Sequence, residues 1–140
     1  MNHMGDTAYA DEYLAALVAA RPDVLTFQVR EKEYYASKKP EESTFLSDDY
    51  YRSAAERTRK AGIKFGVGLC DVEKVAFFES IDTDLYKILS KDIGNRELVA
   101  AALATGKPVY VSTGMSSEEE LASFLAGLGA PLPKNLLLIH

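Results

Sequence analysis

The segment from Leu85 to Met115 constrains the fold more than any other part of the chain. Two short runs of apolar and β-branched residues, Leu85–Leu89 and Val109–Val111, flank a segment with the apolar spacing of a helix. This is the pattern of a βαβ unit, in which a helix joins two parallel strands. Polar or glycine residues follow each run, namely Ser90-Lys91-Asp92 and Ser112-Thr113-Gly114. In parallel α/β folds, such C-terminal strand ends carry the functional residues.

The same alternation continues through the whole chain and predicts five helices and five strands. Helices are expected over 8–20, 48–62, a short stretch after Asp71, 95–105 and 116–128. Strands are expected over 24–29, 63–69, 85–89, 108–112 and 136–140. The residues from Arg30 to Ser47 show no period and are expected to form a functional or mobile loop. Strict alternation indicates a parallel sheet with right-handed crossovers, either doubly wound or closed as a barrel.

Polar residues in front of the expected helices indicate where each helix begins. Such residues cap a helix because a side-chain oxygen accepts a hydrogen bond from a free backbone N–H group. The expected caps, in chain order, are Asp6 or Thr7, Asp48 or Asp49, Asp71, Asn95 and the capping box Ser116-Ser117-Glu118-Glu119.

The two ends of the sequence favour the barrel. Residues 1–6 are polar and lead directly into a helix, as if a strand preceded them, and the chain stops on a strand. A parallel sheet needs both faces covered and its edges protected. We therefore expect residues 1–140 to form one domain, a partial TIM-type (β/α) barrel of about five parallel strands alternating with five helices.

Composition excludes several classes of protein. A net charge of −5, with no basic block longer than Lys38-Lys39, argues against nucleic acid as a partner. No apolar run approaches the roughly 20 residues of a membrane span, and no signal peptide is evident, so a cytoplasmic protein is expected. The single cysteine, Cys70, excludes an internal disulfide and a thiolate zinc cluster, and we expect it to be an inert apolar filler.

Five ordered motifs resemble the N-acylneuraminate (sialic acid) synthase family, which includes the pseudaminic and legionaminic acid synthases. The motifs are Asn2–Asp6, Phe27-Gln28, Tyr86–Ser90, Gly106–Val109 and Ser112–Met115, and they cover essentially the whole chain. The resemblance implies a (β/α)8 barrel that condenses phosphoenolpyruvate with an N-acylated mannosamine-type sugar. It also implies a divalent metal ion, Mn or Mg, as cofactor.

The resemblance implies roles for individual residues. Lys87, Ser90 and Ser112 are expected to hold phosphoenolpyruvate, which agrees with the chemistry of one cation and hydroxyl groups at strand ends. Asp92 stands where the family has an acidic residue near the substrate and is expected to be catalytic. The residues expected at the mouth of the barrel are Asn2, His3, Gln28 and Thr113.

The chain also departs from the family pattern. Thr26 stands where the family has a lysine, and Val67–Cys70 replaces a Ser-Thr-Pro-Phe segment. The family's first strand, its C-terminal antifreeze-like domain and the strands that carry its two metal-binding histidines have no counterpart in these residues. His140 matches a family histidine that is not a metal ligand. We therefore expect no metal ligand in this chain, and we expect the 140-residue chain alone to be inactive.

Simpler interpretations stand beside these. Lys87 can pair with Asp92 or Asp71 without binding any ligand. Ser112 and Thr113 can serve only as a turn and a cap. Two other functions also fit the sequence. One is a non-catalytic module that binds an anion or a sugar phosphate. The other is a structural half-barrel whose sheet edges pair in a homodimer.

Overall fold

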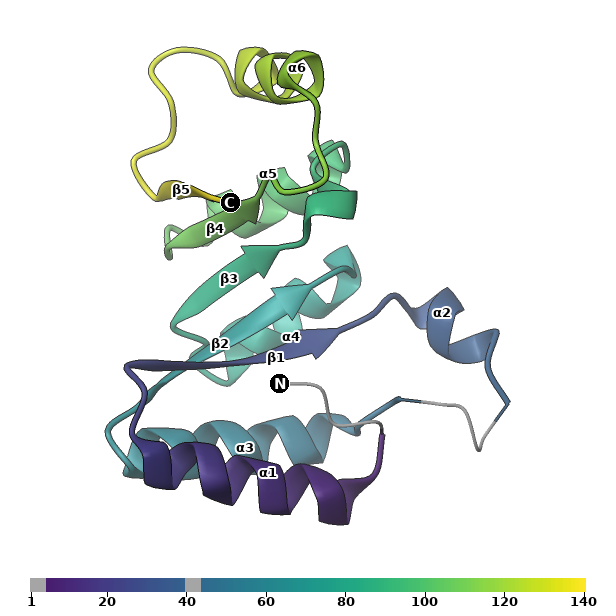
Figure 1. The fold of residues 1–140 in the computed structure, drawn as a ribbon, viewed down its shortest axis with the longest axis vertical. Helices are drawn as coiled ribbons and strands as arrows, with labels where there is room; N and C mark the ends of the chain where they lie inside the picture. The colour runs from purple at the N-terminus through teal and green to yellow at the C-terminus, as the bar shows by residue number, and fades with distance from the viewer. Residues whose placement is uncertain (1–4, 40–43) are drawn as a thin grey trace.

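A single parallel sheet forms the centre of the computed structural model, which describes residues 5–39 and 44–140. Its strands follow the chain order β1-β2-β3-β4-β5 (Figure 1). Their bounds are Val24–Val29, Lys64–Leu69, Leu85–Ile88, Val109–Ser112 and Leu136–Ile139. Each strand therefore pairs with its sequence neighbours, whereas the order of a doubly wound sheet reverses at a switch point. The order is that of a barrel.

Helices connect the strands, as the alternation predicts. The α-helices are α1 (Thr7–Ala20), α2 (Lys32–Ala36), α3 (Asp48–Lys60), α4 (Val75–Ser80), α5 (Arg96–Ala104) and α6 (Glu118–Leu128). In the described part of the chain, short 3₁₀ helices follow β2 and β3, namely η2 (Val72–Lys74) and η3 (Ser90–Asp92). Helix α2 was not expected, because it lies in the segment 30–47 that shows no apolar period.

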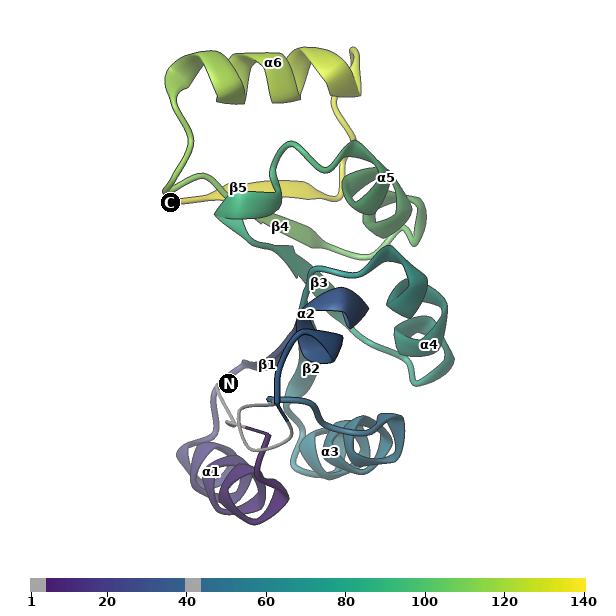
Figure 2. The ribbon, with the colours of Figure 1, turned by 90° about the vertical axis from the view of Figure 1, so that its right-hand side faces the viewer.

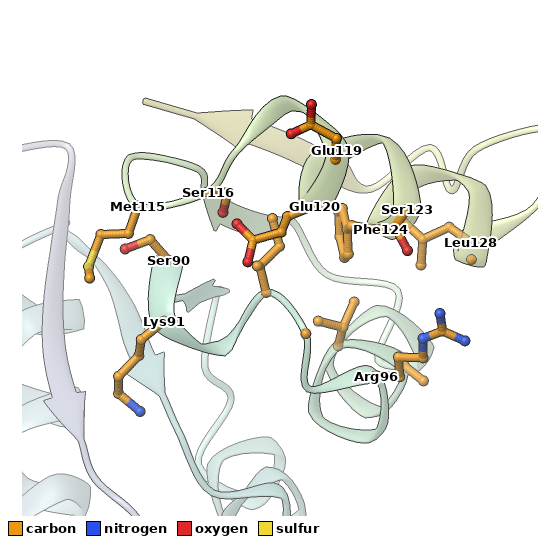
Figure 3. A pocket seen from close by; sticks show the side chains of 15 residues that line it. Ser90, Lys91, Arg96, Met115, Ser116, Glu119, Glu120, Ser123, Phe124 and Leu128 are labelled. Carbon is orange, nitrogen blue, oxygen red and sulfur yellow. The ribbon is translucent and has the colours of Figure 1, made fainter.

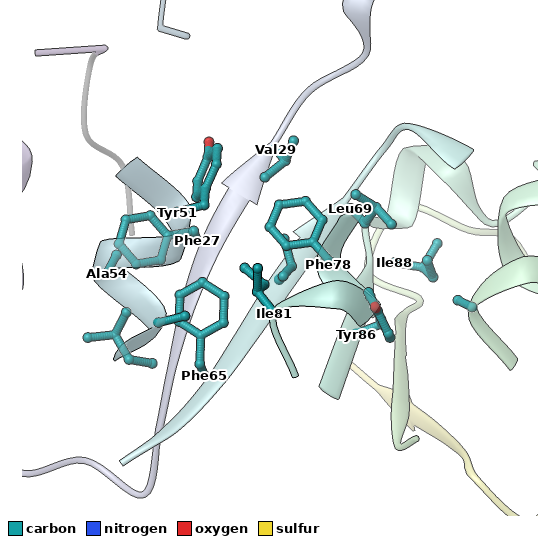
Figure 4. Packing of buried hydrophobic residues seen from close by; sticks show 14 of the residues in the cluster. Phe27, Val29, Tyr51, Ala54, Phe65, Leu69, Phe78, Ile81, Tyr86 and Ile88 are labelled. Carbon is teal, nitrogen blue, oxygen red and sulfur yellow. The ribbon is translucent and has the colours of Figure 1, made fainter. Parts of the chain in front are cut away.

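The face of the sheet that packs against helices holds the hydrophobic core. Figure 2 shows α3, α4 and α5 along the same side of the sheet. Phe27 lies at the centre, with its ring 5.6 Å from that of Phe65 and 5.8 Å from that of Tyr51 (Figure 4). Other buried strand residues continue this layer: Leu25, Val29, Val67, Leu69, Tyr86, Ile88, Val109 and Val111. Each large apolar side chain buried here contributes about 1.5–3 kcal/mol to folding.

The opposite face of the sheet is polar towards its C-terminal edge. The pairing register aligns one residue from each strand across the whole sheet, and such partners point to the same face. This row consists of Gln28, Gly68, Lys87, Tyr110 and Leu137. We call this side the inner face, because it corresponds to the interior of a barrel.

Helix caps follow the expectation at three positions. Asp6 accepts hydrogen bonds from the N–H groups of Ala8 and Tyr9, which selects Asp6 over Thr7 as the cap of α1. Asp71 caps η2, the short helical turn that leads into α4, and Asn95 caps α5, both through side-chain oxygens.

The caps of the other two helices differ from the expectation by one residue. Ser47 caps α3, and Asp48 and Asp49 lie in its first turn. The capping box of α6 joins Ser117 to Glu120, so the predicted pair of Ser116 and Glu119 is wrong. Both errors arise because runs of cap-forming or acidic residues offer several registers. The favoured register places the acidic residues in the positive first turn of the helix.

None of the helices within residues 5–39 and 44–140 is long and apolar enough to cross a membrane.

Candidate functional site

Lys87 is the central cation of the inner face. It is the third residue of β3 and is half-buried. Within residues 5–39 and 44–140, no carboxylate forms an ion pair with its ammonium group. The alternative interpretation, in which Lys87 pairs with Asp92 or Asp71, is therefore wrong. A half-buried ammonium without an anionic partner is well placed to bind an anion.

Glycine 68 leaves open the space between Lys87 and Gln28. It occupies the same row, and a Cβ atom added there would meet only ordinary contacts of 3.6–3.9 Å. Gly66, the other glycine of β2 on the inner face, has no such space for a side chain. A Cβ atom at Gly66 would lie 2.6 Å from Leu85 and 2.9 Å from Thr26. Thr26, which replaces the lysine expected from the family pattern, thus helps to cover Gly66.

The two serines expected to bind phosphoenolpyruvate lie at neighbouring strand ends. Ser90 begins η3, close to the C-terminus of β3, and Ser112 is the last residue of β4. Ser112 lies two residues beyond Tyr110, so it shares the inner face with Lys87. The structure therefore brings together Lys87, Ser112 and Gln28 on one face, with Ser90 at the adjoining turn.

Thr113 has a structural role at the same edge. Its backbone N–H donates to the carbonyl oxygen of Ile139 at 2.8 Å, and its hydroxyl group lies 3.2 Å from that oxygen. The hydroxyl oxygen also lies 3.5 Å from Nδ1 of His140. These contacts join the ends of β4 and β5. Asn2 and His3, the other residues expected at this mouth, lie outside the described residues.

Asp92 lies in a charged network that spans three strand ends. Its Oδ1 atom lies 2.7 Å from Nζ of Lys91, which also lies 2.7 Å from Oε1 of Glu31. Arg30 donates from Nε to Oε2 of Glu31 at 2.9 Å. Cys70, directly after β2, lies among these groups, and one ligand atom each from Glu31, Cys70 and Asp92 fall within 4.8 Å of one another. We call these five residues the strand-end network.

The strand-end network shifts the pKa values of its members. Burial acts to raise the pKa of Glu31, but hydrogen bonds from Lys91, the backbone and Arg30 outweigh it and lower that pKa to about 2. Burial, followed by the nearby Asp92 carboxylate, raises the pKa of the Cys70 thiol to about 12. Glu31 is therefore ionised at neutral pH, and Cys70 is a neutral thiol.

Sequence reasoning identified Asp92 but missed its partners. Glu31 and Lys91 lie 60 residues apart, so no local pattern could connect them. The available signal was positional, because Arg30, Glu31, Cys70 and Lys91 all lie within three residues of the C-terminal end of a strand. In a parallel sheet those positions meet at one edge.

The strand-end network does not fit a manganese or magnesium ion. Such an ion needs oxygen ligands at about 2.0–2.2 Å, and the Lys91 ammonium already contacts one oxygen of each carboxylate. The third group, Cys70, is a sulfur donor held in its protonated form, which disfavours binding of hard cations. This part of the chain therefore supplies no site for the cofactor that the resemblance implies.

A cavity of about 710 Å³ lies beside the strand ends, between α5 and α6 (Figure 3). Ser90 and Lys91 line its end nearest the sheet, whereas Phe124 and Leu128 line its apolar wall. A second cavity of about 440 Å³ lies near α2 and includes Tyr35, Tyr51 and Phe77 in its lining. Lys87 and Ser112 line neither cavity, so the inner face and the two cavities are separate features.

Comparisons with known proteins agree with this geometry. A protein of Methanocaldococcus jannaschii described as uncharacterised is 29% identical over all of this chain and 43% of its own length. The N,N'-diacetyllegionaminic acid synthase of Legionella pneumophila is 26% identical over all of this chain and 46% of its own length. The crystal structure of a sialic acid synthetase from Leptospira borgpetersenii matches 99% of this chain and 50% of that chain. Its TM-score is 0.82, at 23% identity.

The match to the sialic acid synthetase structure confirms the predicted fold, part of a TIM-type barrel. The chain spans less than half the length of the two relatives above. The family model described as the NeuB family matches residues 13–140, which is most of the chain. The protein belongs to the NeuB family.

Proposed function

We propose that this chain forms the phosphoenolpyruvate-binding part of a NeuB-type synthase that makes a nonulosonic (sialic) acid. The observation that carries the proposal is the half-buried ammonium of Lys87 on the inner face, beside the strand end that carries Ser112; it forms no ion pair within residues 5–39 and 44–140. Family membership supports the class of reaction, and the names of the relatives support an N-acyl amino sugar as the second substrate.

In the proposed reaction, C3 of phosphoenolpyruvate forms a bond to the aldehyde carbon of the sugar. Water adds at C2, and inorganic phosphate leaves. Lys87 binds the phosphate or carboxylate group, and the hydroxyl groups of Ser90 and Ser112 orient it. Gln28, across Gly68 from Lys87, bounds the same space. Asp92 supplies the carboxylate for general acid–base catalysis.

A calorimetric titration with phosphoenolpyruvate tests the proposal. Lys87→Met is expected to raise the dissociation constant about 10- to 100-fold, because a hydrogen bond to a charged group contributes roughly 1.5–3 kcal/mol. Lys64→Met is the matched control, since Lys64 is exposed at the opposite end of the same face. Equal loss of affinity in both variants, or no binding by the unchanged protein, would contradict the proposal.

We also propose that two copies of the chain associate through the edges of the sheet. Within residues 5–39 and 44–140, β1 and β5 lie at the edges of the sheet, and an edge strand presents hydrogen-bonding groups to another chain. On β5, Leu137 and Leu138 are 39% and 42% exposed. Light scattering is expected to give twice the mass of one chain, and Leu138→Lys to shift it towards the monomer. A monomeric mass at high concentration would contradict this.

A further inference from the structure

Lys91 occupies the centre of the strand-end network. Its Nζ atom lies 2.7 Å from a carboxylate oxygen on the loop after β1 and 2.7 Å from another on the loop after β3. The Asp92 side chain is only 12% exposed, and that of Glu31 is 30% exposed. Two carboxylates this close repel each other unless a cation lies between them.

The network is electrically balanced by its own residues. Arg30 and Lys91 supply two positive charges, and Glu31 and Asp92 supply two negative charges. The remaining member, Cys70, is buried and neutral. Of the four carboxylate oxygens, only Oδ2 of Asp92 has no hydrogen-bond partner among the described residues, and a divalent cation there would lie next to the Lys91 ammonium group, which repels it.

We propose that Lys91 is a positioning residue whose ammonium group acts as a fixed cation, holding the Asp92 carboxylate and excluding a divalent metal ion from the strand-end network. The role of Lys91 in catalysis rests on the function proposed above for Asp92. Its role as the resident cation rests only on its contacts with Glu31 and Asp92.

The test uses Mn²⁺ alone as a paramagnetic probe in NMR spectra of the full chain. Lys91→Met removes the charge at similar length, and Lys91→Arg retains it. In Lys91→Met, we expect Mn²⁺ to broaden the backbone signals of Glu31, Cys70 and Asp92, with binding about tenfold or more tighter than in the unchanged protein. The unchanged protein and Lys91→Arg are expected to show broadening there no stronger than at the exposed acidic residues Glu118 and Glu119.

A second readout tests positioning. The carboxyl ¹³C signal of Asp92 is expected to shift in Lys91→Met and to return to its original position in Lys91→Arg, without added metal. Equal Mn²⁺ broadening in the unchanged protein and Lys91→Met would overturn the proposal, as would an Asp92 signal that the charge at Lys91 does not affect. If Lys91→Met does not fold, the other two proteins still test the proposal. Strong Mn²⁺ broadening of the Glu31 and Asp92 signals in the unchanged protein or in Lys91→Arg would overturn it.

Neither readout requires phosphoenolpyruvate or turnover. Failure of phosphoenolpyruvate binding contradicts the proposed function, whereas failure of the Mn²⁺ comparison contradicts the role of Lys91. The two failures are therefore distinguishable.

Discussion

The two faces of the sheet are built from the same strands but differ in what they bury. On the helix-covered face, Phe27, Phe65 and Tyr86 are fully buried. On the inner face, the row beside them contains Gln28, Gly68 and Lys87. Because alternate residues of a strand point to opposite faces, adjacent positions such as Tyr86 and Lys87 serve different purposes. One face thus holds the core that stabilises the fold, and the other is the face to which we assign binding.

The largest effect on stability is expected from a substitution in the core of the helix-covered face. Phe65→Ala removes a fully buried ring that packs on Phe27 and should lower the free energy of unfolding by about 3–5 kcal/mol. Lys87→Met alters a half-buried residue of the inner face and should change the free energy of unfolding by less than about 1 kcal/mol. Urea denaturation measures both. Similar losses would show that the inner face also stabilises the fold.

Two glycines of β2 sharpen the comparison within the inner face itself. Gly66→Ala should cost about 1–3 kcal/mol, because its Cβ atom would lie within 3.0 Å of Leu85 and Thr26 side chains. Gly68→Ala meets contacts of 3.6 Å or more and should leave stability unchanged or raise it by up to about 1 kcal/mol. Thermal denaturation of both variants checks this. The opposite order would mean that the open space lies at Gly66 and not beside Lys87.

Helix α6 lies at the limit of the packed face, because none of its residues is buried. Its start should therefore depend on local hydrogen bonds. Ser117→Ala removes the cap and should cost the helix about 1 kcal/mol. Ser116→Ala is the control and should cost less. Hydrogen exchange of the α6 amides measures the difference, and equal protection in both variants would argue that packing holds the helix.

The smallest expected effect concerns the acid stability of the strand-end network, because the Glu31 side chain is 30% exposed and solvent screens its ion pairs. The pKa of Glu31 in the folded protein is about 2, below its ordinary value of 4.5. Its ionised form therefore stabilises the fold above about pH 4.5, and this contribution is lost as the pH falls towards about 2. Glu31→Gln should be less stable at pH 7 and should lose less stability on acidification. Urea midpoints from pH 7 to pH 2 test this, and parallel curves would contradict it.

The fold could be predicted well because its signals are local. Strand positions follow from short apolar runs, and caps such as Asp6 and Asn95 act on N–H groups two or three residues away. The register of the α6 cap could not be resolved, because Ser116-Ser117 and three consecutive glutamates allow two capping boxes.

The candidate site was predictable only in part. Lys87 and Ser112 were identified from motif resemblance, and the pairing register places them on one face. The network around Asp92 was not predictable, because its partner Lys91 also contacts Glu31, and these two residues meet only in the tertiary structure. Lys91 is adjacent to Asp92 in sequence, but adjacency alone does not indicate an ion pair that also reaches the loop after β1.

The most direct test of the central claim is to map phosphoenolpyruvate binding on the chain by NMR. Titration of the ¹⁵N-labelled protein should shift the amide signals of Lys87, Ser90 and Ser112, at the C-terminal edge of the inner face. The signals of Lys64, at the other end of that face, should not move. Shifts centred on Lys64, or on the cavity between α5 and α6, would contradict the account.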